Sequence, residues 1–299
     1  MSKTKLRSAQ YSINEYLKQL KGYSFASRAD MRHMLNRCIK DLHELGFNIA
    51  HIKGLKPKHI HVLVEHWKTQ NKNPATIKNY MAKLRKMAIL LDKPQLVKPS
   101  NDAYQISRRS YIPTHNKAIY QVDFSNCTDS MIRLSLEAQS LFGLRREESM
   151  KLIISEAWIG DSLRIKPSWT KGGIGRTLLI TNNDQRHWLI KASQIVPSGQ
   201  SLIPKDRTYK QHLNHYQIQT KQMEIRKCHG LRHAYAQNRY HELTKEFDPH
   251  KKGWLCPIAR GAASKSLNPL QKAIDRKVRE IISREIGHSR RSITKIYVG

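Results

Sequence analysis

The chain closes on the stretch Gly287-His288-Ser289-Arg290-Arg291-Ser292-Ile293-Thr294-Lys295-Ile296-Tyr297-Val298-Gly299, in which a tyrosine follows a Gly-His pair. Two further basic clusters lie upstream, Gly143-Leu144-Arg145 and His229-Gly230-Leu231-Arg232-His233. A phenol can act as a nucleophile if its proton is handled and if a cationic pocket receives the charge of the transition state. One phenol, two separated arginines and two separated histidines therefore indicate a site that attacks a phosphodiester.

The charge of the chain indicates a polyanionic partner. Its 299 residues include 54 Lys and Arg against 23 Asp and Glu, a formal net charge of +31. Such an excess repels itself in a compact protein unless a polyanion neutralises it. The basic residues lie in segments with helical apolar spacing and not in a low-complexity tail, so folded surface carries the charge. A nucleic acid is therefore the expected partner.

Several other classes of protein are disfavoured. No run of apolar residues is long enough for a membrane span, and no signal-peptide pattern opens the chain. None of the 15 histidines stands in an HExxH motif or a Cys/His ligand set, so no metal site is predicted. The cysteines show no paired spacing and are expected to be reduced thiols of a cytoplasmic protein, namely Cys38, Cys127, Cys228 and Cys256.

The first third of the chain is predicted to be a helical DNA-binding domain, residues 1–98. Apolar residues recur there at spacings of three and four, and turns with Gly, Asn and Pro separate the helices. The last helix, Ala75–Leu91, is amphipathic, and its outer face is cationic through Lys78, Lys83, Arg85 and Lys86. We predict that this face grips a duplex by backbone contacts, which carry no sequence information. A generic four-helix bundle is the alternative.

Residues 99–116 are predicted to be a linker, because they contain prolines and show weak periodicity. The pair Arg108-Arg109 is predicted to contact DNA where the linker crosses the backbone. Such a linker would let two domains close around the duplex.

The second domain, residues 117–299, is predicted to be mainly helical with a small β-sheet, an α+β fold. Helices are expected at Asp129–Phe142 and Arg145–Ala157, and strands on both sides of a glycine-rich hairpin tip that carries Lys171. His229 and Arg232 share one face near the start of a later helix, where backbone N–H groups favour an anion. Arg145 and Glu148 stand one turn apart, and their spacing alone favours a surface salt bridge.

Taken together, these clusters resemble the tyrosine recombinase (phage integrase) family over most of residues 118–299. Gly143-Leu144-Arg145-Arg146-Glu147-Glu148 is similar to the first box of the family and implies a catalytic Arg145 and a supporting Glu148. Thr170-Lys171-Gly172 resembles the hairpin that bears the catalytic lysine, Lys171.

The remaining motifs follow in the family's order. His229-Gly230-Leu231-Arg232-His233-Ala234 resembles the second box and implies catalytic roles for His229 and Arg232. Gly287-His288-Ser289, with Tyr297 beyond it, resembles the terminal box and implies His288 and the nucleophile. The amino-terminal bundle loosely resembles the family's core-binding (SAM-like) domain, so the resemblance implies a C-shaped clamp.

The resemblance implies a mechanism for cutting and rejoining DNA. Tyr297 would attack the scissile phosphate and form a 3′-phosphotyrosyl link, while Lys171 protonates the departing 5′ oxygen. His229 would assist proton handling. Three side chains would stabilise the charge at phosphorus, namely Arg145, Arg232 and His288. Neither ATP nor a metal is required, because the covalent link conserves the bond energy.

The resemblance also implies partners: two recombination sites on double-stranded DNA, a homotetramer, and accessory DNA-bending or directionality factors, acting on the bacterial nucleoid. Two features depart from compact family members. An insertion is predicted at residues 241–270, and only Val298 and Gly299 follow Tyr297, so the tail helix that often docks on a neighbouring protomer is missing. We expect the insertion, with its lysines and Trp254, to substitute as a protomer or DNA contact.

Several alternatives stay open. A type IB topoisomerase shares the nucleophile and arginine chemistry, and a catalytically inactive DNA-binding regulator would keep only the charge. Among recombinases, an integrase that inserts and excises a mobile element is our first choice over a resolvase or a transposon recombinase. The sequence leaves undecided the target DNA and whether Tyr297 acts in cis or in trans.

Overall fold

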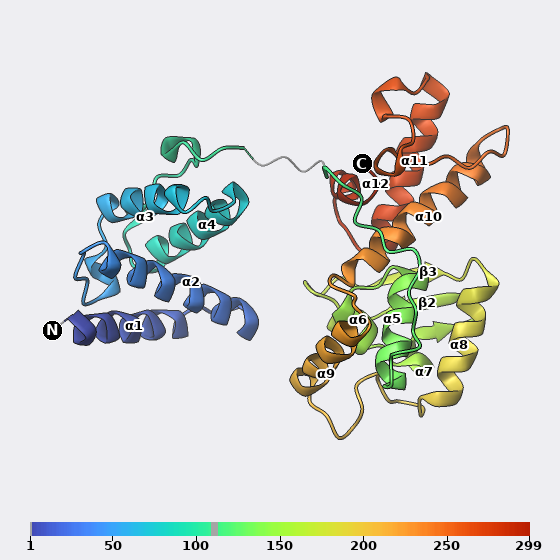
Figure 1. Ribbon diagram of the computed structural model, residues 1–299, viewed down its shortest axis with the longest axis horizontal. Helices are drawn as coiled ribbons and strands as arrows, with labels where there is room; N and C mark the ends of the chain where they lie inside the picture. Colours follow the sequence, from blue (N-terminus) through green and yellow to red (C-terminus); the bar gives the residue numbers. More distant parts are fainter. Residues whose placement is uncertain (1, 109–112) are drawn as a thin grey trace. The chain divides into compact units, whose positions relative to one another are not determined.

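The computed structural model describes residues 2–108 and 113–299, and the chain divides into two compact units, Met1–Ser110 and Tyr111–Gly299 (Figure 1). The predicted DNA contact Arg109 lies outside the described residues. The two units are mainly helical, with one three-stranded antiparallel sheet in the second unit. The expected α+β fold class is thus confirmed.

The first unit is a bundle of four helices, α1 Ser2–Lys18, α2 Phe25–Glu44, α3 Pro57–Thr69 and α4 Pro74–Leu90. The starts of the helices follow from local sequence. Ser24 caps α2 by accepting a hydrogen bond from the Ser27 backbone N–H, and Asn73 caps α4 by accepting one from Ala75. Apolar faces of all four helices meet in one core, which also buries Asp41; its carboxylate accepts from Trp67 Nε1 at 3.0 Å. This hydrogen bond and the ion pair with Arg37 at 2.8 Å make the buried charge of Asp41 tolerable.

The first unit runs further than its predicted end at residue 98. The short 3₁₀ turn Asp102–Tyr104 returns the chain to the bundle, where Tyr104 and Ile106 are buried in the same core. The Tyr104 hydroxyl accepts a hydrogen bond from the Lys98 backbone N–H at 2.9 Å. Two buried apolar side chains are enough to hold this part of the predicted linker against the helices.

In the second unit, one face of the small sheet packs on helices. Strands β1 Trp158–Ile159, β2 Ser162–Ile165 and β3 Arg176–Leu179 pair in that order, with Leu163 opposite both Trp158 and Leu178. These three apolar side chains point inward because cross-strand partners share a face. They pack against α5 Ser130–Phe142 and α8 Asn183–Ile195, which lie beside the sheet in Figure 1.

The prediction of one helix at Arg145–Ala157 is wrong, because the structure has two short helices there, α6 Arg146–Met150 and α7 Ile154–Ala157. Between them the backbone opens to pair with a distant segment: Leu152 O accepts from Leu202 N–H at 3.2 Å, and Ile153 bridges Ser201. Tertiary pairing overrides the helical pattern of the local sequence here.

Further helices follow in the second unit. They are α9 Tyr209–Gln222, α10 His229–Phe247, α11 Pro269–Glu285 and α12 Lys295–Val298. The last three share a core, which also buries Cys256. No helix within the described residues has the length and apolar character to cross a membrane.

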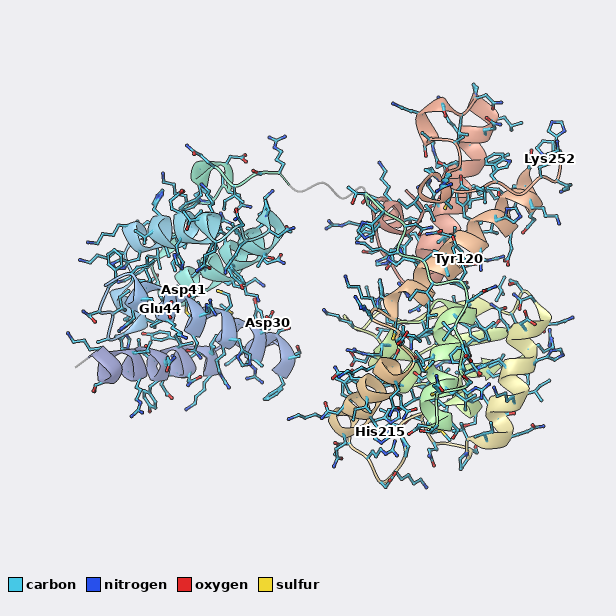
Figure 2. The ribbon with its side chains drawn as sticks, in the orientation of Figure 1. Asp30, Asp41, Glu44, Tyr120, His215 and Lys252 are labelled. Atoms are coloured by element: carbon cyan, nitrogen blue, oxygen red, sulfur yellow. The ribbon has the colours of Figure 1, made fainter. Side chains whose placement is uncertain are left out.

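The predicted insertion, 241–270, begins inside α10 and continues as an irregular segment. Cys256 and Leu267 are buried, and the Trp254 ring N–H donates to Asp248 Oδ2 at 3.3 Å. Lys252 lies on an exposed turn of the segment, as Figure 2 shows. The segment is therefore part of the core beneath α12, and its role as a protomer or DNA contact stays a prediction.

Candidate active site

Three separate parts of the chain bring polar side chains to one place. Helix α10 begins at His229, so His229, Arg232 and His233 stand on one face at helical spacing. Helix α11 ends at Glu285, and Gly287, with φ of +65°, turns the chain so that His288 and then α12 return to α10. A positive φ favours glycine, which explains the residue at this turn.

The Tyr297 hydroxyl lies at the centre of this cluster. It accepts a hydrogen bond from Arg232 Nε at 3.3 Å and is hydrogen-bonded to His288 Nε2 at 3.3 Å and to His229 Nε2 at 3.2 Å. Tyr297 is only 4% exposed. The phenol is thus surrounded by groups that can take its proton and by a cation that can stabilise an oxyanion.

Arg232 is a buried cation held by the backbone. It is 1% exposed, and its two terminal nitrogens donate to the carbonyl oxygens of Gly143 and Ile286. Burial lowers the pKa of Arg232 to about 10, an effect that the nearby Tyr297 opposes. The guanidinium therefore stays charged at neutral pH, and its orientation is fixed before any ligand arrives.

Arg145 is oriented by a buried carboxylate. Glu148 is fully buried; it accepts from Arg145 Nη1 at 2.7 Å and from the Arg145 backbone N–H at 2.8 Å. The surface salt bridge favoured from spacing is therefore wrong, because packing of α6 against α5 buries the carboxylate. Burial alone would raise the pKa of Glu148, but hydrogen bonds and charge from Arg176, followed by those from Arg145, lower it to about 2.

Arg176 also belongs to this cluster, and sequence reasoning did not include it among the candidate site residues. It lies at the start of β3, and both of its terminal nitrogens donate to Glu148, at 2.8 and 3.1 Å. Its Nε donates to the Glu285 carbonyl at 2.6 Å. A Cβ on Gly287 would lie 2.8 Å from Arg176 Nη1, so a larger residue there would displace this guanidinium. The residue stands inside the hairpin motif, but no spacing rule relates it to Glu148.

His233 also belongs to the cluster without having been predicted. Its ring lies 4.6 Å from the Tyr297 ring, centroid to centroid, at an interplanar angle of 36°. Burial lowers the pKa of His233 to about 4, and burial with the charges of Arg232 and Arg145 does the same for His288. Partial burial and these arginines also lower the pKa of His229. The imidazoles are therefore neutral at pH 7 and can accept a proton.

The structure thus brings together five of the six predicted catalytic residues, Arg145, His229, Arg232, His288 and Tyr297, and leaves Lys171 apart. Lys171 is exposed on the turn between β2 and β3. No hydrogen bond or ion pair among the described residues involves it. Its role as a general acid stays a prediction, which requires the hairpin tip to approach the bound phosphate.

Some of the predicted DNA contacts already have partners within the protein, and others do not. Lys83 pairs with Asp30 at 2.6 Å, and Lys86 lies over the Tyr23 ring. Arg85 donates to the Lys98 carbonyl and to Asn101 Oδ1, so it ties down the chain after α4. Lys78 is half-buried and Arg108 is exposed, and neither has a described ion pair. Lys78 and Arg108 are therefore the better candidates for phosphate contacts.

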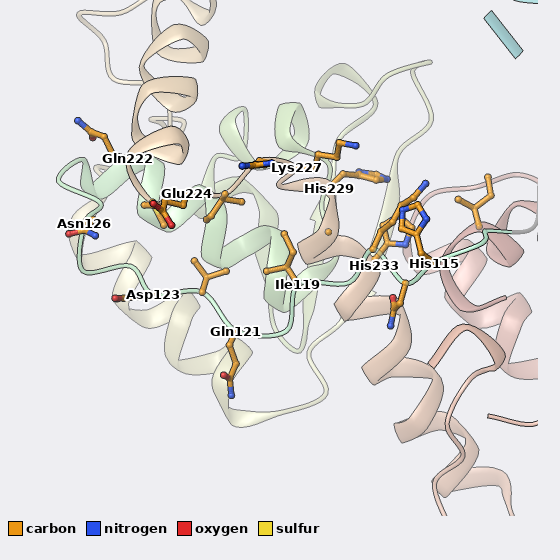
Figure 3. Close-up of a pocket in the computed structure, with 18 residues that line it drawn as sticks. His115, Ile119, Gln121, Asp123, Asn126, Gln222, Glu224, Lys227, His229 and His233 are labelled. Carbon is orange, nitrogen blue, oxygen red and sulfur yellow. The ribbon is translucent and has the colours of Figure 1, made fainter. Parts of the chain in front are cut away.

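A pocket of about 1070 Å³ opens beside the cluster. His229, His233 and His115 lie at one end of it, and Gln222, Asp123 and Asn126 at the other (Figure 3). Lys117, Arg226 and Lys227 add positive charge to its lining. No group of three or more metal-binding side chains occurs in the part of the chain that the structure describes.

Two family models match the chain and together cover most of it. The model described as "Phage integrase, N-terminal" matches residues 11–96, and the model described as "Integrase" matches residues 106–238. Comparison with the sequences of curated proteins finds no match.

The fold is similar to those of solved recombinase structures. A lambda integrase dimer bound to a COC′ core site superposes with a TM-score of 0.59 at 13% identity, over 97% of this chain and 94% of that one. The Tn1549 transposon integrase in complex with circular intermediate DNA superposes with a TM-score of 0.54 at 12% identity, over 98% of this chain and 95% of that one. The XerH site-specific recombinase bound to its difH substrate superposes with a TM-score of 0.53 at 16% identity, over 97% of this chain and 81% of that one. At these identities the similarity establishes the fold.

Proposed function

This chain belongs to the tyrosine recombinase (phage integrase) family, whose members cleave and rejoin DNA at specific sites, and we propose that it does so with Tyr297 as nucleophile. One observation carries the proposal: the Tyr297 hydroxyl lies within hydrogen-bonding distance of Arg232, His229 and His288. A phosphate that enters this cluster meets a nucleophile, a fixed cation and neutral imidazoles at once.

In the proposed reaction the Tyr297 oxygen attacks the scissile phosphorus and the bond to the 5′ oxygen breaks. The phenolic proton passes to a neighbouring imidazole, His229 or His288, both of which are neutral at pH 7. Arg145 and Arg232 receive the charge on the non-bridging oxygens. Lys171 protonates the 5′ oxygen after the hairpin tip closes on the DNA. Attack by a 5′ hydroxyl of the partner strand reverses the steps and frees Tyr297.

We propose that the basic face of α4, through Lys78, and the exposed Arg108 hold the phosphate backbone of the duplex. Because the lambda integrase structures contain dimers and a tetramer on DNA, we propose a homotetramer that holds two sites. The match to integrase models favours integration and excision of a mobile element. Accessory DNA-bending or directionality factors would set the direction.

A covalent-capture experiment tests the function and does not require the target sequence to be known. The full chain is incubated with a pool of nicked duplexes of randomised sequence, in which loss of a short fragment after cleavage prevents religation. Protein-linked DNA is recovered and sequenced. We expect enrichment of one sequence joined to the chain through its 3′ phosphate, with no adduct from Tyr297→Phe.

Three results would overturn the proposal. An equal yield of adduct from Tyr297→Phe would exclude this nucleophile, and absence of any adduct from the native chain would favour the inactive regulator. Adducts without sequence enrichment, together with relaxation of supercoiled DNA, would favour the topoisomerase.

A further inference from the structure

Gln237 is a buried amide whose hydrogen-bonding groups are all used. It lies on α10, about two turns after His229, and is 4% exposed. Its Nε2 donates to the Tyr297 carbonyl at 2.9 Å and to Asn116 Oδ1 at 2.8 Å. Its Oε1 accepts from Asn116 Nδ2 at 3.1 Å and from the Tyr120 hydroxyl. An amide offers two N–H donors and two acceptor lone pairs, so none is left over.

The partners of Gln237 belong to the segment that leads into the second unit. Asn116 accepts from the Ala118 backbone N–H at 3.0 Å, which fixes its own conformation. Ile119 N–H donates to the Gly230 carbonyl at 3.0 Å, and a Cβ on Gly230 would meet Ile119 at 2.6 Å. The segment 116–120 therefore lies directly on the first turn of α10.

The backbone of Tyr297 has few other tethers. Helix α12 is four residues long, too short for its own hydrogen bonds to hold it in place. Arg279 Nη1 donates to the Gly299 carbonyl at 2.6 Å, beyond the tyrosine. Apolar contacts bury Val298 and Tyr297, but they are non-directional and fix depth better than orientation. The Gln237 donor is the contact that sets the direction of the Tyr297 carbonyl.

We propose that Gln237, held by Asn116 and Tyr120, is a positioning residue for the nucleophile. It fixes the main chain of Tyr297 so that the hydroxyl faces Arg232 and the phosphate. This inference rests on the proposed function of Tyr297. It also gives the segment 116–120 a role, because any displacement of Asn116 is transmitted through one side chain to the tyrosine.

The decisive variant is Gln237→Glu, which preserves shape but replaces two donors by acceptors. Its carboxylate would repel the Tyr297 carbonyl and Asn116 Oδ1. Gln219→Glu is the matched control, because Gln219 is equally buried and its Nε2 also makes two donor bonds, but to Thr128 and Gln222 and not to Tyr297. Each variant is tested in single-turnover cleavage of the nicked duplex recovered by covalent capture, at saturating protein.

We expect Gln237→Glu to lower the cleavage rate constant roughly 100-fold, the cost typical of misplacing a reacting group by about 1 Å. Its DNA affinity and final yield of adduct should match those of the native chain, and Gln219→Glu should cleave at nearly the native rate. A residue with only a structural role would lower the yield, by reducing the folded fraction, and leave the rate constant unchanged. That result, or a native rate constant, would overturn the inference.

A second variant covers the case in which Gln237→Glu does not fold. Asn116→Ala combined with Tyr120→Phe alters two exposed residues and releases the amide without a charge in the core. A lower rate constant with native yield supports the inference, and a native rate constant overturns it. If the native chain itself forms no adduct, the proposed function is overturned, and the inference about Gln237 falls with it. If only the variants lose rate, the proposed function stands.

Discussion

The cations of α4 and those around Tyr297 look alike in sequence but differ in their surroundings. On α4, Lys83 pairs with Asp30, whose side chain is 68% exposed, so solvent screens the pair. In the candidate site, Arg145 and Arg176 share Glu148, which is fully buried. Arg232 is also buried and faces backbone carbonyls.

The difference shows what each region can do. A cation near water can exchange its partner for a phosphate at little cost, so it contributes affinity that falls with salt. A buried cation must have its hydrogen bonds satisfied in the folded state, and it is then oriented for a ligand before binding. We therefore expect changes on α4 to alter DNA affinity, and changes around Tyr297 to alter stability and rate.

The largest effect is expected from removing the buried carboxylate that the two arginines of the candidate site share. Glu148→Ala leaves the largely buried guanidinium of Arg176 and the partly exposed one of Arg145 without a carboxylate. We expect it to lower the free energy of unfolding by about 3–5 kcal/mol. Asp30→Ala is the matched control, because it breaks the solvent-screened pair with Lys83, and we expect it to lower the free energy of unfolding by about 0–1 kcal/mol. Urea denaturation of both variants measures the difference, and similar losses would contradict the distinction.

An intermediate effect comes from the histidines, which the α4 face lacks. The pKa of His233 is lowered from its ordinary 6.5 to about 4, so the folded state binds fewer protons than the unfolded state between these values. The stability that this shift contributes is present above pH 6.5 and is lost as the pH falls toward 4. We expect His233→Asn to reduce the loss of stability between pH 7 and pH 5 by on the order of 1–2 kcal/mol.

Urea denaturation at both pH values measures this dependence. Because the variant also changes packing against Tyr297, the quantity compared is the change with pH and not the stability at one pH. An identical change in the native chain and in His233→Asn would show that His233 does not cause the acid sensitivity.

The smallest effect concerns single cations of the first unit. We expect Lys78→Ala to weaken DNA binding about equally for all sequences and to reduce the slope of log affinity against log salt by about 1. Arg85→Ala should leave that slope unchanged, because its guanidinium already binds the Lys98 carbonyl and Asn101. Binding titrations at several salt concentrations measure both slopes, and equal slopes for the two variants would contradict the assignment.

The sequence predicted most of the helices and five residues that the fold brings together. Helices are local, so spacing and caps such as Asn73 indicate them without reference to the rest of the chain. The break between α6 and α7 could not be predicted in this way, because it depends on pairing with Leu202. Arg176 and Gln237 were missed for the same reason: their partners lie 28 and 60 residues away.

By itself the sequence determined the charge, the helical character and the order of the motifs that include Arg145, Arg232, His288 and Tyr297. These follow from residue types and short spacings, which act through local hydrogen bonds and hydrophobic periodicity. Only the tertiary structure decided that Glu148 is buried between two arginines and that one amide joins Asn116 to Tyr297. Burial and long-range hydrogen bonds arise only when distant segments pack together, so no local pattern contains them.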